Sequence, residues 1–143
     1  MVVRGAAEAA RWYASAFGAI EVGQRIEVPG GKLIHVELRL GDSAVMLADE
    51  FPELGIRSPR SVGGTSVVLQ ILTDEVDALW ARAVTAGATV VHPLSDQFWG
   101  ERQGQVEDPF GHRWNLAAHV RDVSPDEVAR AAAIAFGGNA SAA

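Results

Sequence analysis

His35 and Glu37 are the first residues in the chain whose types and spacing could support catalysis. Residues two apart on an extended strand point to the same face, so the imidazole and the carboxylate would be neighbours and could form a general acid–base couple. Arg39 continues the same spacing, and alternating charges on an exposed strand face are the simpler interpretation. Neither a Ser–His–Asp arrangement nor a phosphate-binding loop accompanies the pair. We therefore assign no catalytic residue.

Metal ligands are scarce in this sequence. The chain has no Cys, which excludes thiolate ligands and a thiol nucleophile. His112 and His119 each lack a His or carboxylate companion at ligand spacing, and an isolated histidine is more typical of a structural or surface position. His112 also shares a strand face with Trp114, which favours a core position. The residues alone thus predict no metal centre and no cofactor.

Two adjacent aromatic residues, Phe98 and Trp99, precede Gly100 in a segment that we expect to be a loop. An aromatic side chain in a loop can stack on a planar ligand at low entropic cost. It can equally anchor the loop or form a contact between two copies of the chain. Both interpretations remain open at this point.

The surrounding pattern predicts the elements that position these residues. Residues 6–17 form an amphipathic helix that ends at Gly18, where helices often finish in a left-handed residue. Residues 32–40 alternate apolar and polar positions, which is typical of a half-buried strand, and residues 43–48 form the return strand of a hairpin.

After a loop rich in Pro, Gly and Ser, the same pattern starts again. Residues 65–72 predict a strand, a helix ending at Gly87 follows, and residues 89–91 predict another strand. Residues 108–111 (DPFG) have the composition of a type I turn between two final strands. Trp12 corresponds to Trp80, 68 positions later, and the strands follow nearly the same offset. The chain therefore contains one unit written twice.

The expected boundaries follow from this duplication. We predict one domain over residues 1–122, with halves at about 1–60 and 64–118. Ser124, Pro125 and Glu127 are typical of a helix start and predict a separate C-terminal helix over residues 124–137. Residues 138–143 are expected to be a disordered tail.

Composition narrows the classes of partner. The 143 residues carry a net charge of −6, which disfavours nucleic acid, and Arg57 and Arg60 are interpreted as part of a solvated loop. No apolar run is long enough to span a membrane and no secretory signal is evident, so we expect no membrane partner and a cytoplasmic location.

Three segments carry a resemblance to a known family: VVRGAAEAARWYASAFGA, HVELRLGDSAVMLADE and DQFWGERQGQVEDPFGHRWNLAAHVRDVSPDEV. The chain resembles the vicinal oxygen chelate superfamily, which includes glyoxalase I, extradiol dioxygenases and bleomycin-resistance proteins, and within it the PhnB-like branch. The resemblance covers residues 2 to about 130. It implies an α+β fold in which two tandem βαβββ modules form a curled mixed sheet around a cup, with a C-terminal helix added.

The resemblance also implies where a metal would be held. Metal-dependent members use four inward-facing His, Glu or Gln residues, which would fall here at about residue 0, Leu47, Val68 and Asn115. Val and Leu offer no lone pair, and a single Asn carbonyl is a weak ligand for a transition metal. These positions reinforce the prediction that the chain has no metal site of the family type.

A metal-independent binding protein of the bleomycin-resistance type, holding an aromatic or antibiotic-like ligand in the cup, is the leading functional hypothesis. The alternative is a metal-dependent glyoxalase, lyase, isomerase or dioxygenase whose ligands lie elsewhere. A homodimer is expected from the resemblance, because many relatives build their cups at or near a subunit interface. The residues expected to bind the ligand are Trp99, Phe98, Asn115, Gln70, Arg113, Glu37, His35 and Leu47.

Overall fold

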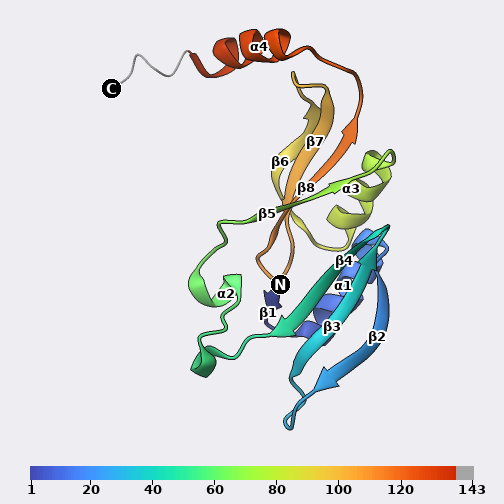
Figure 1. Cartoon of the computed structure of the whole chain (residues 1–143), viewed down its shortest axis with the longest axis vertical. Coiled ribbons are helices and arrows are strands. Elements are labelled where there is room, and N and C mark those ends of the chain that lie inside the picture. The colour runs from blue at the N-terminus through green and yellow to red at the C-terminus, as the bar shows by residue number, and fades with distance from the viewer. Residues whose placement is uncertain (138–143) are drawn as a thin grey trace.

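Two four-stranded sheets, each with its own helix, make up the computed structural model of the chain, which describes residues 1–137 (Figure 1). The first half runs through its elements in the order strand, helix, strand, strand, strand. Its sheet has the strand order β1-β4-β3-β2, with β1 parallel to β4 and the other pairs antiparallel. The elements are β1 (Val2–Val3), α1 (Ala6–Phe17), β2 (Ile20–Glu27), β3 (Leu33–Leu40) and β4 (Ser43–Asp49).

The second half repeats this plan. Its sheet has the order β5-β8-β7-β6, again with one parallel pair, β5 with β8, followed by antiparallel pairs. The predicted α+β fold with two βαβββ halves is therefore confirmed. The elements are β5 (Val68–Leu72), α3 (Val76–Thr85), β6 (Thr89–Asp96), β7 (Glu101–Glu107) and β8 (Arg113–His119).

The segment between the halves is more structured than a plain loop. It contains a short 3-10 helix η1 (Pro52–Leu54) and a one-turn helix α2 (Pro59–Val62). The predicted C-terminal helix is present as α4 (Pro125–Gly137), which extends away from both sheets in Figure 1 and has no buried residue. The predicted tail at 138–143 lies outside the described residues. No helix of the described chain is long and apolar enough to cross a membrane.

Local chemistry explains where α1 begins. The carboxylate of Asp49, at the end of β4, accepts hydrogen bonds from the backbone N–H groups of Gly5 and Ala6, both at 2.9 Å. These N–H groups have no partner inside the helix, so a negatively charged acceptor stabilises the helix start. Gly18 ends the helix at a φ of 71°, a left-handed conformation that favours glycine. Asp49 thus ties the first helix to its own sheet.

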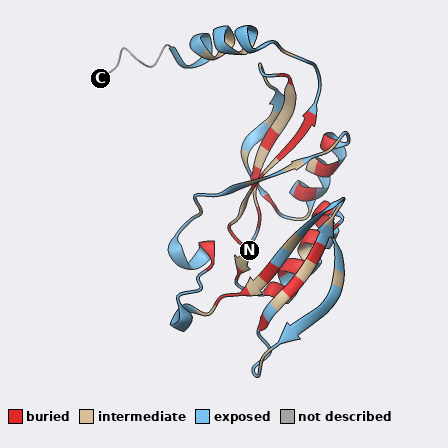
Figure 2. Ribbon diagram, viewed as in Figure 1, coloured by how far each residue is buried: buried red, intermediate tan, exposed pale blue. Residues whose placement is uncertain are grey.

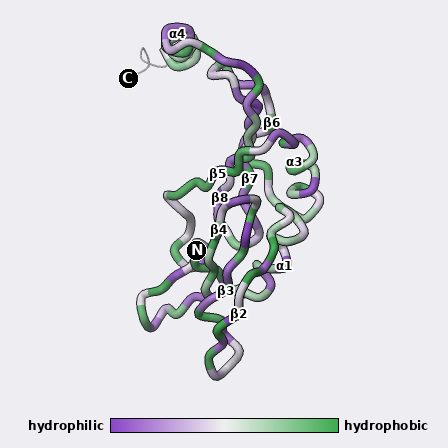
Figure 3. Tube along the Cα trace, turned by 45° about the vertical axis from the view of Figure 1, so that its right-hand side comes forward, coloured by the Kyte–Doolittle hydropathy of each residue, from purple (hydrophilic) through white to green (hydrophobic). Residues whose placement is uncertain are grey.

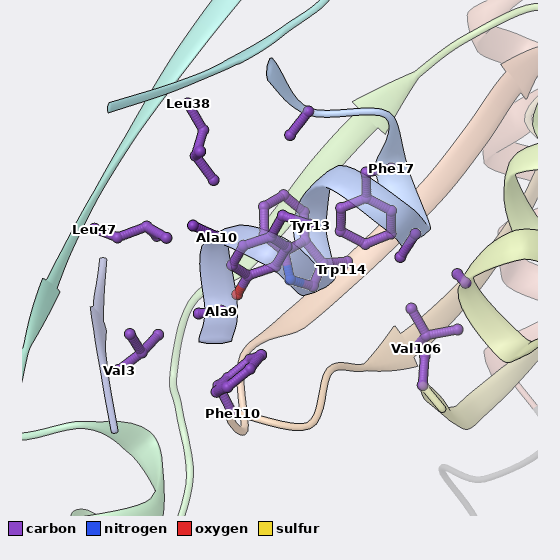
Figure 4. Close-up of a cluster of buried hydrophobic side chains, with 14 of the residues drawn as sticks. Val3, Ala9, Ala10, Tyr13, Phe17, Leu38, Leu47, Val106, Phe110 and Trp114 are labelled. Atoms are coloured by element: carbon purple, nitrogen blue, oxygen red, sulfur yellow. The ribbon is translucent and has the colours of Figure 1, made fainter. Parts of the chain in front are cut away.

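The two halves share one hydrophobic core, to which helices and strands of both halves contribute buried residues (Figure 2). Side chains from both sheets surround α1 in this core (Figure 4). Leu38 and Leu47 approach α1 from the first sheet, and Trp114 approaches it from the second, with its ring centroid 5.6 Å from that of Tyr13. The indole N–H of Trp12 donates to the carbonyl of Ala86 at the end of α3, at 2.7 Å. The helix-bearing faces of the two sheets are therefore joined.

This packing leaves the opposite face of each sheet uncovered by the chain's own helices. On β8, Trp114 and Leu116 are buried against the helices, whereas Arg113 and Asn115 alternate with them and point to the other face. The strands of the two sheets do not pair with each other in the described residues. The cup expected between the halves is therefore not enclosed by a single chain.

Candidate functional site

The open face of the second sheet carries four carboxamide side chains, which we call the amide face: Gln70, Gln103, Gln105 and Asn115. The strand register brings them together, because Asn115 on β8 lies between Gln70 on β5 and Gln105 on β7. The amide nitrogen of Gln105 donates to the carbonyl oxygen of Asn115 at 2.9 Å. Along β7, hydrophilic residues alternate with Gly104 and Val106. Hydrophilic and hydrophobic segments are interspersed along the strands of this sheet (Figure 3). The structure thus brings together two of the predicted ligand-binding residues, Gln70 and Asn115.

The chemistry of the amide face is neutral recognition. A carboxamide donates through its NH₂ group and accepts through its carbonyl, so the face can match either partner on a ligand. Val68 and Leu72 share the face on β5 and have 43% and 63% of their surfaces exposed, which supplies apolar area beside the polar groups. Such a lining is typical of a site for a small molecule with flat apolar parts and several polar groups.

Arg113, another predicted site residue, stands on the same face next to Asn115. Its guanidinium faces Glu107 on β7, with 3.6 Å between Arg113 Nε and Glu107 Oε2. Arg60 on α2 approaches the same carboxylate from the other side, at 3.6 Å between Nη1 and Oε1. Sequence reasoning placed Arg60 in a solvated loop, because the contact depends on how α2 folds back over the β7–β8 turn.

Glu37 and His35 occupy β3, in the first sheet. Glu37 pairs with Met46 across the β3–β4 ladder and lies on the open face of that sheet, and both Glu37 and His35 are half-buried. Among the residues that the structure describes, Glu37 forms neither a hydrogen bond with His35 nor an ion pair with Arg39. The geometry therefore provides no acid–base couple at this position.

Leu47, expected to line the cup, lies on the opposite face of its strand. It pairs with Val36, is 1% exposed and belongs to the core around α1 (Figure 4). The constant offset of 68 failed because the second hairpin spans one residue more: Glu37 pairs with Met46, nine positions later, whereas Gln105 pairs with Asn115, ten positions later. A shift of one residue reverses the face of every side chain. Met46, not Leu47, is the counterpart of Asn115.

The donor set on the open faces does not fit a divalent metal of the family type. The counterpart positions hold the thioether of Met46 and the amide of Asn115, with Val68 and Gln70 on β5, and none of these is an anionic or imidazole ligand. Across the described residues, no three His, Cys, Asp or Glu side chains converge. His112 instead places its Nε2 atom 2.8 Å from the carbonyl oxygen of Val2, a contact between the two halves.

Phe98 and Trp99 lie in the turn between β6 and β7, at the far end of the second sheet. Their rings are in edge contact with centroids 4.8 Å apart, and the Trp99 indole donates to Glu101 at 3.1 Å. Glu101 shares a strand face with Gln103, two residues or about 7 Å away, and with Gln105, four residues or about 13 Å away. The aromatic pair therefore lies beyond the Gln103 end of the amide face, about 13 Å from the hydrogen-bonded pair of Gln105 and Asn115.

A hollow lies between the two halves of the chain, where the family resemblance predicted a cup. It is a cleft of about 590 Å³ that separates the β3–β4 turn from β5 and α3, and its floor includes Phe17, Leu69 and Trp114. These floor residues belong to the helix-bearing side of the sheets and come together only when the two halves pack. Gln70 and Leu72 on β5 also line the cleft, so it adjoins the amide face along this strand.

Tyr13 and Glu50 are two groups with shifted pKa values, and both stabilise the fold rather than the site. Burial and the neighbouring Asp108 carboxylate raise the pKa of Tyr13 above its usual value. Hydrogen bonds from Ser61, Ser58 and Arg4 lower the pKa of Glu50 to about 2. Both groups lie away from the amide face and hold segments together, which leaves recognition, rather than proton transfer, as the chemistry that the open face offers.

Comparison with known proteins places the chain in a family. A model described as the glyoxalase/bleomycin resistance protein/dioxygenase superfamily matches residues 1–116. Uncharacterized proteins of Mycobacterium bovis and Mycobacterium tuberculosis H37Rv are each 49% identical over 131 residues, covering 90% of this chain and 86% and 76% of the relative.

Solved structures show the same architecture. TioX from Micromonospora sp. ML1 is 29% identical with a TM-score of 0.63, over 84% of this chain and 94% of that one. A gene product from Arabidopsis thaliana is 32% identical with a TM-score of 0.64, over 81% and 92%. A Pseudomonas aeruginosa protein, at 21% identity and a TM-score of 0.66 over 85% and 95%, supports the fold alone.

Proposed function

The chain belongs to the glyoxalase/bleomycin resistance protein/dioxygenase superfamily, and from this premise we propose that it is a metal-independent small-molecule-binding protein of the bleomycin-resistance type. The observation that carries the proposal is the amide face, where four neutral carboxamides lie beside exposed apolar side chains. A protein that sequesters its ligand needs affinity and no chemical step, and this lining suits an aromatic ligand that carries several amide or hydroxyl groups.

The proposal includes a homodimer. Ile20 and Met46 on the open face of the first sheet are each 54% exposed, and Leu72 on the second is 63% exposed. Exposed apolar side chains on the open face of a sheet are available for an interface with another chain. Since the two halves of one chain are joined through their helix-bearing faces, an enclosed cup requires an open face from a second copy. We place each cup between the amide face of one copy and the first sheet of its partner.

The proposal also gives a role to the turn that carries Phe98 and Trp99. In a dimer of this kind, Phe98 and Trp99 would meet the partner chain or the rim of a cup. Within the superfamily, we place the chain in the PhnB-like branch on the three segments quoted above, of which the last, residues 96–128, is the most specific. A metal-dependent enzyme is the competing function, and it needs a converging set of His, Asp or Glu ligands, which the described residues do not form.

Binding can be tested by titrating the protein with a panel of planar aromatic antibiotics while following tryptophan fluorescence. We expect at least one compound to bind with a defined stoichiometry, and Asn115→Leu to weaken it about tenfold, because a ligand group then loses its partner in a desolvated site. Thr85→Val, an isosteric change on the exposed side of α3, is the control. Absence of binding across the panel, or activity that depends on an added divalent metal, would overturn the proposal.

A further inference from the structure

One end of the amide face carries a group of charged side chains, to which the proposed function assigns no role. Arg60 from α2 and Arg113 from β8 stand on either side of Glu107, around a hollow of about 450 Å³ that also contains Thr65 and Gly111. We call Arg60, Arg113 and Glu107 the arginine cradle. The cradle has two positive charges and one negative charge, in a chain whose overall charge is −6.

The single carboxylate does not satisfy the two guanidinium groups. Both arginines lie 3.6 Å from Glu107, which is longer than the roughly 2.8 Å of a direct charge-assisted hydrogen bond. Arg60 donates through Nε and Nη2 to the carbonyl of Pro109, at 3.2 and 3.1 Å, which holds its guanidinium over the β7–β8 turn. Each guanidinium has five N–H donors, so most donors of the pair remain free for an acceptor in the hollow.

Backbone geometry keeps the hollow open and the arginines in place. Gly111 has a φ of 90°, and an added Cβ atom would lie 3.0 Å from the Cβ of Pro59 and 3.5 Å from Nε of Arg60. A larger residue would therefore be strained and would crowd Arg60. Both arginines are accessible, with 47% and 43% of the Arg60 and Arg113 side chains exposed. The cradle is thus a preformed, solvent-accessible site with excess positive charge.

Its position relates it to the ligand site. Arg113 and Asn115 are two residues apart on one face of β8, which is about 7 Å. A ligand with an anionic group in the cradle would extend its body over the amide face. We propose that the ligand of this protein carries an oxyanion, a carboxylate or a phosphate, that binds between Arg60 and Arg113. This proposal rests on the proposed function, because it assigns the charge and the orientation of the molecule in the same site.

Two kinds of probe separate the cradle from the cup. Inorganic phosphate tests the cradle alone, whereas the pair 2-naphthoate and 2-naphthamide tests whether an aromatic body gains from a carboxylate. Binding is measured by calorimetry at low ionic strength, where exposed charges are little screened. We expect naphthoate to bind the full chain more tightly than naphthamide. Phosphate binding with no binding of either aromatic compound would support the cradle and count against the proposed cup.

Variants give opposite predictions for the members of the cradle. Arg113→Gln should weaken binding of phosphate and naphthoate about fivefold to tenfold, because a charge-assisted contact is lost. Glu107→Gln should strengthen binding of both anions about threefold, because the competing carboxylate is removed. Arg11→Gln and Glu53→Gln make the same charge changes at exposed positions outside the cradle and should leave anion binding unchanged.

Three results would overturn the cradle. The first is naphthamide binding as tightly as naphthoate, which would leave the proposed cup intact. The second is an equal loss of anion affinity in Arg113→Gln and Arg11→Gln, which would show that Arg113 acts only through the net charge of the chain. The third is a failure of both phosphate and naphthoate to bind at millimolar concentration.

Discussion

The phenolic hydroxyl of Tyr13, on the first helix, donates a hydrogen bond to Oδ2 of Asp108 in the second half, at 2.5 Å. The same carboxylate accepts from the indole of Trp114 at 2.8 Å and from the backbone N–H groups of Phe110 and His112. Asp108 is 1% exposed, so a single buried carboxylate joins α1 to the β7–β8 turn. This contact holds the halves together through their helix-bearing faces and leaves both open faces available.

Loss of the Tyr13 hydroxyl should destabilise the chain without emptying the core. In Tyr13→Phe the ring remains packed between Phe17 and Trp114, but Asp108 loses one of four donors. A hydrogen bond to a buried charged group contributes roughly 1.5–3 kcal/mol, so the free energy of unfolding in urea should fall by about that amount. Unchanged stability would show that the remaining donors already satisfy Asp108.

Tyr13 also makes stability depend on alkaline pH. Burial and the Asp108 charge raise its pKa in the folded state, so the folded chain keeps the phenolic proton where the unfolded chain releases it. The contribution of Tyr13 to stability should therefore be constant below pH 10, and stability should fall above pH 10 by about 1.4 kcal/mol per pH unit. Tyr13 is the only tyrosine, so ultraviolet absorbance of phenolate should appear only as the protein unfolds. Phenolate absorbance in folded protein near pH 10 would contradict the burial of this group.

Glu50 should make the stability of the chain depend on pH under acidic conditions. Its carboxylate accepts from Ser61, Ser58 and Arg4, which lowers its pKa to about 2 from a usual 4.5. A depressed pKa gives stability that is present above pH 4.5 and is lost progressively as pH falls towards 2. The melting temperature of the wild type should therefore decline in this range, and that of Glu50→Gln should start lower and decline less. Parallel curves for the two proteins would contradict the prediction.

Gly104 on β7 should tolerate no side chain. An added Cβ atom would collide with the indole ring of Trp80 and lie 2.8 Å from the backbone nitrogen of Leu94. Gly104→Ala should destabilise the chain by about 1–3 kcal/mol, a usual cost of overpacking, since α3 must move from the sheet. Gly137→Ala in α4 meets no atom within 4 Å and is the matched control. Similar unfolding midpoints for both variants would refute the close contact.

The periodic elements and the duplication could be predicted from the sequence, because helix and strand periods are local properties. The helix over residues 6–17 has the predicted bounds, and the second half repeats the order of the first. A constant offset could not show which residues of β4 point to the core, because the β7–β8 hairpin spans one residue more than the β3–β4 hairpin. Leu47 therefore points to the core, and Met46 points to the open face.

Contacts between distant segments were beyond local patterns. The spacing of Gln70 and Asn115 suggested one face, and the register confirms that they are neighbours. Arg60 reaches Glu107 only because α2 folds over a turn 49 residues later, at Pro109. The relation of Trp99 to the amide face likewise depends on strand length, which sequence reasoning underestimated for β6: residues 89–91 were expected, and the strand runs to Asp96.

In the proposed dimer, a complete cup needs two copies of the chain. The absence of Cys allows a direct measurement: Met46→Cys protein is mixed with Asn115→Cys protein and treated with a short bismaleimide. Each variant treated alone serves as the control. The account predicts a covalent dimer on a denaturing gel that forms far more readily in the mixture than with either variant alone. A double variant that carries both cysteines is also treated with the reagent. Cross-linking only within single chains of this double variant, with no covalent dimer in the mixture of single variants, would contradict the two-copy cup.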